Sequence, residues 1–146
     1  MLRTTIQQDQ ITALKTGDKK KLDILRFILA QIKNKEVDKK SELDDLETIT
    51  VLQKLQKELI ESIEAFQKGN RQDLAADSQA QLEIVKSYLP KEISDAELKI
   101  EIERIKAANI AAYQQNPKAL IGLCMKALRT KASSTRILKI LMEYVA

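Results

Sequence analysis

The 146-residue sequence has no histidine or tryptophan, one cysteine, two prolines, three glycines, two phenylalanines and three tyrosines. Without histidine, the commonest general base and metal ligand is missing. The single Cys124 excludes an intrachain disulfide and a multi-cysteine metal site, and its apolar surroundings suit a small core residue. So few aromatic residues argue against a surface that stacks single-stranded bases. Scarce glycine and proline disfavour a β-rich fold, which needs frequent turns.

Membrane-spanning and phosphate-binding patterns are also missing. No apolar run is long enough to cross a bilayer, and the opening MLRTTIQQDQ lacks the apolar segment of a signal peptide. We therefore expect a cytoplasmic location and no membrane partner. No glycine-rich phosphate loop is present, and the acids at 42–45 are better explained by the capping of a helix than by a metal cluster. We expect no catalytic residue, no cofactor and no bound metal.

The residues that are abundant favour an all-α fold, because Ala, Leu, Ile, Lys, Glu and Gln dominate and apolar residues recur at gaps of three and four. The expected helices cover residues 4–15, 19–37, 45–68, 71–87 and 95–112, with one more from Asn116-Pro117 and a last one capped by Ser133 or Ser134. We expect Ile11 and Leu14 to face inward.

Pro90 divides the expected structure, because proline ends a helix and biases the residue before it away from helical geometry. We predict an N-terminal helical hairpin unit at 1–90 and a smaller three-helix bundle at 91–146. The helices at 19–37 and 45–68 are expected to form the antiparallel hairpin. Gly122 lies inside a predicted helix, and a close helix–helix contact explains it better than the approach of a ligand.

Charge is unevenly distributed along the chain. Residues 1–40 hold ten cations and five acids, residues 41–117 hold nine and fifteen, and residues 118–146 hold six and one. The C-terminal basic set consists of Lys126, Arg129, Lys131, Arg136 and Lys139. If its two helices pack antiparallel, these cations share one end of the bundle and favour contacts with nucleic-acid phosphates, without DNA sequence recognition. The alternative is a scattered, solvated surface.

Two blocks resemble the YqeY family of small bacterial proteins. One runs from Asp18-Lys19-Lys20-Lys21-Leu22 to Ile32-Lys33-Asn34-Lys35-Glu36-Val37. The other covers 69–90, with an Arg-x-Asp-Leu opening and a Tyr-Leu-Pro exit, and continues through Glu92-Ile93-Ser94. A third block departs from the family pattern. Gly122, Arg129, Lys131 and Ala132 match, whereas Thr130, Ser133 and Ser134 replace a glycine, an aspartate and a second glycine, and Lys126 replaces a proline.

The C-terminal part of this family resembles the tail of the GatB subunit of tRNA-dependent amidotransferases. The resemblance implies a tRNA-binding or amidotransferase-like accessory module that acts by positioning. Carbon–nitrogen ligase activity with glutamine as amido donor, as recorded for the family, is then inherited from the larger enzyme. The implied partners are tRNA and a tRNA-synthesising or amidotransferase protein. The alternatives are a protein–protein adaptor and a subunit that takes part in amide transfer only inside a complex.

Overall fold

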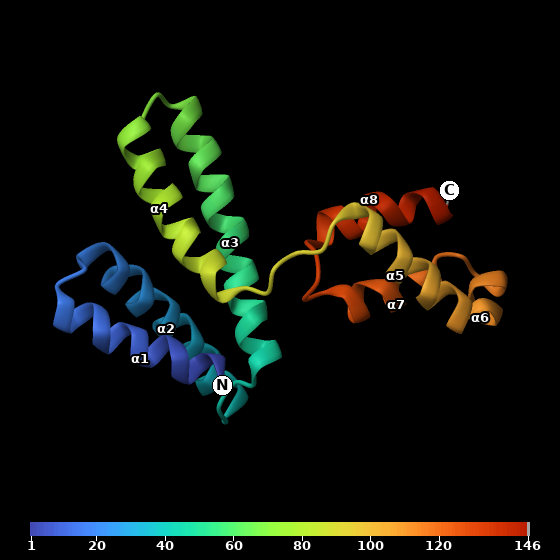
Figure 1. The fold of residues 1–146 in the computed structure, drawn as a ribbon, viewed down its shortest axis with the longest axis horizontal. Helices are drawn as coiled ribbons and strands as arrows, with labels where there is room; N and C mark the ends of the chain where they lie inside the picture. Colours follow the sequence, from blue (N-terminus) through green and yellow to red (C-terminus); the bar gives the residue numbers. More distant parts are fainter. Residues whose placement is uncertain (146) are drawn as a thin grey trace. The chain divides into compact units, whose positions relative to one another are not determined.

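The computed structural model describes residues 1–145, which form eight α-helices and no strand (Figure 1). The predicted all-α fold is thus confirmed. The helices are α1 Leu2–Thr16, α2 Lys19–Lys39, α3 Asp45–Lys68, α4 Gln72–Tyr88, α5 Asp95–Ala108, α6 Ile110–Gln115, α7 Ala119–Leu128 and α8 Ser134–Val145.

Side-chain caps set several helix starts. Asp44 accepts a hydrogen bond from the Glu47 backbone N–H at 2.8 Å, and the Glu47 side chain accepts from the Asp44 N–H at 3.2 Å, which completes a capping box. Asp18 caps α2 by accepting from the Lys21 N–H. Gly17 ends α1 with a φ of 75°, a left-handed conformation that glycine adopts without steric cost.

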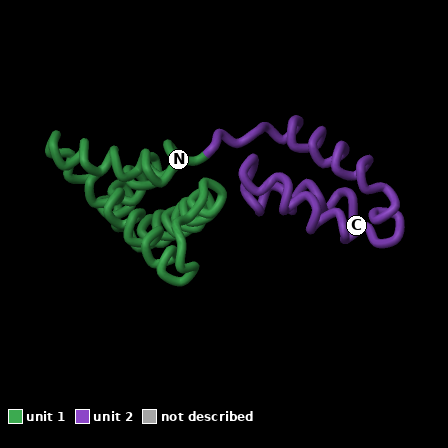
Figure 2. Tube along the Cα trace, turned by 90° about the horizontal axis from the view of Figure 1, so that it is seen from below, with its two compact units in different colours: residues 1–89 green, residues 90–146 purple. Residues whose placement is uncertain are grey.

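The chain packs as two compact units, Met1–Leu89 (unit 1) and Pro90–Ala146 (unit 2), coloured separately in Figure 2. Unit 1 consists of two helical hairpins, α1 with α2 and α3 with α4 (Figure 1). The expected main hairpin of 19–37 with 45–68 is therefore corrected, since α2 and α3 make a lesser contact. The short turn at 69–71 lets α4 fold back along α3 and take the place that we had assigned to α2.

The core of unit 1 lies where the two hairpins meet. Its fully buried members include Ile6, Leu25, Ile28, Ile32, Leu52 and Val85. Ile11 and Leu14 were expected to face inward, but they are 47% and 58% exposed. Ile6 and Ala13, seven residues apart, are the buried positions of α1, so α1 turns a narrow stripe inward and leaves Ile11 and Leu14 in solvent.

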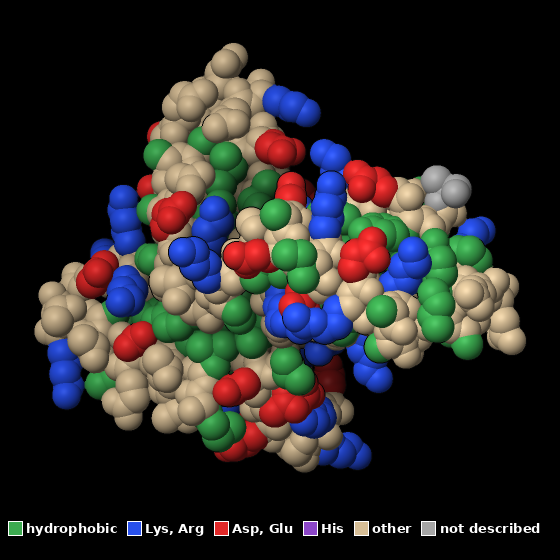
Figure 3. Space-filling view, turned by 45° about the vertical axis from the view of Figure 1, so that its right-hand side comes forward, with side chains coloured by type: hydrophobic (Ala, Val, Ile, Leu, Met, Phe, Trp, Pro, Cys, Tyr) green, Lys and Arg blue, Asp and Glu red, His purple; other side chains and the backbone are tan. Residues whose placement is uncertain are grey.

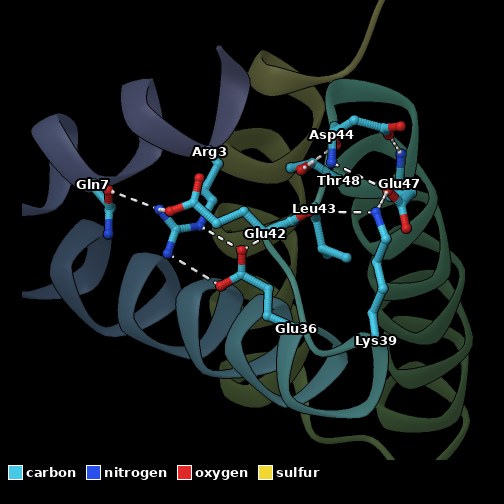
Figure 4. A network of polar contacts seen from close by, with 9 residues as sticks. All are labelled: Arg3, Gln7, Glu36, Lys39, Glu42, Leu43, Asp44, Glu47 and Thr48. Atoms are coloured by element: carbon cyan, nitrogen blue, oxygen red, sulfur yellow. Dashed lines mark hydrogen bonds and ion pairs between the residues drawn. The ribbon is translucent and has the colours of Figure 1, made fainter.

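Polar contacts close the end of unit 1 where α1, α2 and α3 meet (Figure 4). Arg3 lies with its Nε 2.8 Å from Glu36 Oε2 and donates from Nη2 to Oε1 at 3.1 Å. Leu43 donates its backbone N–H to the same Glu36 carboxylate at 3.0 Å. Burial raises the pKa of Glu36, but the bonds from Leu43 and Arg3 and the nearby positive charges outweigh it, so the net pKa is lowered.

A second polar contact joins the end of α4 to α1, because the Tyr88 hydroxyl donates to Asp9 Oδ2. Burial, together with the bond to Asp9 and the charge of Asp9, raises the pKa of Tyr88 well above its usual value. Tyr88 also packs against the core of unit 1.

Unit 2 contains α5, α6, α7 and α8, which is one helix more than the expected three-helix bundle. The helix predicted at 95–112 breaks at Asn109, whose backbone leaves helical geometry at φ −129° and whose side-chain amide donates to the Ile105 carbonyl at 2.9 Å. The buried core of unit 2 comprises Leu98, Ile102, Leu120, Cys124, Leu128, Ala132, Ile137, Ile140 and Leu141.

Gly122 does not make the close helix–helix contact that we expected. A Cβ added at this position would meet no heavy atom within 4 Å, and the residue is exposed on α7.

Among the described residues, no helix combines the length and apolar character needed to cross a membrane.

We predict that Gly122→Ala stabilises the protein by about 1 kcal/mol, because alanine lowers the conformational entropy of the unfolded chain and meets no clash in α7. Urea unfolding followed by circular dichroism measures the change. Gly17→Ala is the matched control and should destabilise, since residue 17 has a φ of 75°. A loss of stability in Gly122→Ala would contradict the open surroundings of residue 122 on α7.

We predict that Tyr88→Phe costs about 1 kcal/mol at neutral pH through loss of the bond to Asp9. The folded-state pKa of Tyr88 is raised, so its contribution is complete below the unfolded pKa of about 10 and is lost as pH rises above that value. Urea midpoints between pH 9 and 11 should therefore fall more steeply for the wild type than for the variant. Parallel curves would contradict the assignment, because all other tyrosines and lysines titrate in both proteins.

Candidate nucleic-acid interface

The whole net charge of the protein lies on unit 2. Unit 1 holds 15 cations and 15 acids, whereas unit 2 holds 10 cations and 6 acids, which gives the net charge of +4. The C-terminal basic set supplies half of the cations of unit 2 and comes from the end of α7, the turn at 129–133 and α8. The geometry separates its members into two groups, those engaged within the fold and those that point outward.

Arg136 is engaged on every side-chain nitrogen. Its Nη1 donates to Glu92 Oε2 at 2.9 Å, and its Nε and Nη2 donate to Asp95 Oδ1 at 3.2 and 2.7 Å. Its Nη2 also donates to the Ile93 backbone carbonyl at 2.8 Å. One guanidinium in the first turn of α8 thereby holds the segment that leads into α5.

The turn at 129–133 is held by the same segment. The Ile93 backbone N–H donates to the Lys131 carbonyl at 2.9 Å. The ammonium of Lys131 lies 3.7 Å from Glu101 Oε2 on α5, and Arg104 pairs with the other oxygen of that carboxylate at 3.3 Å. Lys131 therefore faces α5, and part of its charge is balanced inside the unit.

Lys126 and Lys139 point away from the core. The buried positions of α7 are Leu120, Cys124 and Leu128, and helical periodicity places Lys126 on the opposite side. Lys139 occupies the same relation to the buried positions of α8. Within residues 1–145 no carboxylate lies within 4.0 Å of either ammonium. Arg129, directly after α7, is exposed as well.

Asp95 lies at the centre of the positive charges of α8 and α5. The hydrogen bond from Arg136 lowers the pKa of Asp95. Burial opposes this shift, and the charges of Arg136, Lys139 and Lys99 lower the pKa further, so the net pKa is lowered. Glu92, Asp95 and Lys99 were not among the predicted site residues. The sequence predicted only a division at Pro90 and a helix from residue 95, and neither pattern signals a contact with α8.

Surface charge is otherwise mixed. Figure 3 shows Lys and Arg side chains beside Asp and Glu side chains across the face in view, without an extended area of one sign. A depression in unit 1 between α2 and α3, lined by Gln31, Lys35, Val51, Lys54, Leu55 and Glu58, has room for only a few water molecules. In the described part of the chain, no group of three or more Cys, Asp and Glu side chains is placed to hold a metal ion.

The cysteine and the two tyrosines of unit 2 are engaged in contacts within the unit. Burial raises the pKa of the Cys124 thiol to about 11, so the nucleophilic thiolate is disfavoured at neutral pH. The Lys106 ammonium lies 4.6 Å from the centre of the Tyr113 ring and 5.6 Å from that of Tyr144. The Tyr113 hydroxyl donates to the Tyr144 carbonyl at 2.7 Å, which ties α6 to the end of α8.

Residues 3–145 match the family described as Yqey-like protein. The chain belongs to this family. The resemblance predicted from the blocks at 18–37 and 69–94 is thus confirmed over nearly the whole chain.

Relatives of this Yqey-like chain include several yeast proteins. "Altered inheritance of mitochondria protein 41, mitochondrial" of Lachancea thermotolerans is 30% identical over 131 residues, which cover 88% of this chain and 68% of the relative. The protein of that name from Eremothecium gossypii is 33% identical over 85 residues, 58% of this chain and 46% of the relative. An uncharacterized protein of Schizosaccharomyces pombe is 28% identical over 94 residues, which cover 64% of this chain and 76% of the relative.

The expected cytoplasmic location is wrong by this comparison, because the named relatives are called mitochondrial and point to mitochondria. The expectation rested on the lack of a leader pattern in the first ten residues. That pattern carries no weight here, since the chain spans less than half of the Eremothecium gossypii relative.

We predict that Arg136→Met lowers the melting temperature by roughly 4–8 °C, the shift that loss of about 1 kcal/mol from the hydrogen bond to Ile93 causes in a small domain. The amide of Ile93 should exchange with deuterium faster, because its acceptor on the turn is no longer held in place. Lys139→Met removes the same charge one turn further along α8 and should leave both observables unchanged. Equal effects of the two variants would refute a specific contact.

Proposed function

We propose that this Yqey-like protein binds tRNA through unit 2 and acts by positioning the RNA, with no covalent step of its own. The observation that carries the proposal is the location of the whole net charge of +4 on unit 2. Lys126 and Lys139 are exposed there, and within residues 1–145 neither ammonium has a carboxylate within 4.0 Å, although the charge of Lys139 acts on Asp95.

Physical chemistry supports the backbone of structured RNA as the ligand. Ammonium groups on a helical surface contact phosphates without reading bases, and double-stranded RNA is recognised mainly by its shape and backbone. The protein has few aromatic residues, and Tyr113 and Tyr144 are engaged with Lys106 and with each other. These features favour a helical region of tRNA over a single strand, which proteins bind by stacking.

The family resemblance to the tail of an amidotransferase subunit supports tRNA in particular. The replacement of glycines by Thr130, Ser133 and Ser134 shapes the proposal, because the turn at 129–133 presents side chains and a buried Ala132 instead of a close glycine backbone. We therefore place the RNA contacts on the outward lysines and not on the backbone of the turn. A protein–protein adaptor is the competing function.

Fluorescence anisotropy with labelled bulk tRNA, titrated across salt, tests the proposal. Each phosphate contact contributes about 0.7–0.9 to the slope of log affinity against log salt. We predict that Lys126→Gln with Lys139→Gln makes the slope shallower by about two contacts, or roughly 1.4–1.8. Circular dichroism verifies that helicity is retained.

Lys57→Gln with Lys86→Gln is the matched control, since it removes two exposed lysines from unit 1 and leaves unit 2 intact. This control should keep the slope of the wild type. Equal losses in both double variants would mean non-specific attraction by net charge. The lack of any binding at low salt would refute the RNA function and favour the adaptor.

A further inference from the structure

The contacts of Arg136 form a site that is already occupied by the protein itself. Two carboxylates, those of Glu92 and Asp95, lie on the edges of the guanidinium at 2.7–3.2 Å. The planar guanidinium fork binds carboxylate and phosphate oxygens with the same geometry. A carboxylate on Arg136 therefore occupies the position that an RNA phosphate would take.

We propose that Glu92 and Asp95 act as an internal phosphate mimic that holds Arg136 in the free protein, and that an RNA phosphate displaces them when tRNA binds. This inference rests on the proposed function and names a regulatory contact of that same surface. Arg136 then has different partners in two states. It binds Glu92 and Asp95 in the free protein and an RNA phosphate in the complex.

The exposure of the three side chains permits this exchange. The side chains of Arg136, Glu92 and Asp95 are 32%, 42% and 72% exposed, so the pair is open to solvent and to a ligand. Exposed ion pairs are weak, and a polyanion with several contacts can compete with them. The bond from Arg136 to the Ile93 carbonyl is part-buried and uses a separate N–H direction, so the guanidinium stays placed when the carboxylates leave.

The surrounding charges favour an anion at this position. Lys139 follows Arg136 by three residues on α8, and Lys99 follows Asp95 by four residues on α5. Both raise the positive potential at Asp95. The Lys99 ammonium also lies 3.8 Å from Glu143 Oε2, so a phosphate in place of Asp95 would meet chiefly Arg136 and Lys139. Lys139 belongs to the outward group that already carries the proposed function.

The test compares tRNA affinity and its salt slope for the full-length wild type and for Glu92→Gln with Asp95→Asn. If the carboxylates compete with phosphate, the variant binds roughly twofold to fivefold tighter, the range that an exposed ion pair supplies. Its salt slope stays close to that of the wild type, because Arg136 contacts a phosphate in the bound state of both proteins. Adding Arg136→Met must abolish the gain in affinity and make the slope shallower by about 0.7–0.9, because one phosphate contact is lost.

Glu97→Gln with Glu103→Gln is the control for charge, since it removes two exposed acids from α5 and leaves the Arg136 contacts in place. The inference is overturned if this control gains as much, or if the gain survives Arg136→Met. Should Glu92→Gln with Asp95→Asn lose helicity, Glu92→Gln alone changes only the segment before α5 and is expected to give the smaller part of the gain.

The outcome separates this inference from the proposed function. Wild-type binding with a salt slope, but no gain in the variant, overturns the mimic and leaves tRNA binding standing. Binding that emerges only in Glu92→Gln with Asp95→Asn overturns the displacement, because RNA then does not replace the carboxylates in the wild type. No binding by either protein at low salt overturns both.

Discussion

The guanidinium of Arg136 is the contact on which the arrangement of unit 2 depends. The segment at 90–94 has no regular secondary structure, and a buried or half-buried backbone without partners is costly. Both backbone groups of Ile93 have partners. Its N–H donates to the Lys131 carbonyl in the turn, and its carbonyl accepts from Arg136. The first residues of unit 2 are thereby joined to its last helix, and the direction in which α5 begins is set by α8.

These hydrogen bonds matter for the stability of unit 2 because the unit is small. A domain of fewer than about 60 residues buries a limited fraction of its surface and is only marginally stable through its core. Its core consists mainly of aliphatic side chains, with Leu98 and Ile102 from α5 packed on α7 and α8. An arginine suits the position better than a lysine, since its planar group donates in several fixed directions at once.

Local signals in the sequence predicted much of the fold. The helix at 45–68 was placed correctly because Asp44 and Glu47 form a capping box and its apolar gaps stay regular. The break at Asn109 was missed, since it comes from one residue whose side chain bonds back to Ile105. Ile11 and Leu14 were misplaced for a different reason. Periodicity shows that a helix has an apolar side, but the partner helix decides how wide a stripe is buried.

At the candidate site, too, local sequence signals do not reveal which residues come into contact in the folded unit. The sequence identifies Arg136 and Lys131 as cations near a turn, but their acidic partners lie 30 to 44 residues away and come together only in the folded unit. A count of basic residues therefore gives an upper bound on the phosphate contacts that a surface can make. Within the C-terminal basic set the fold has committed Arg136 to structure and has left Lys126 and Lys139 outward. One guanidinium thus serves the stability of unit 2 through its bond to Ile93, and an anionic ligand gains a contact with it only by replacing Glu92 and Asp95.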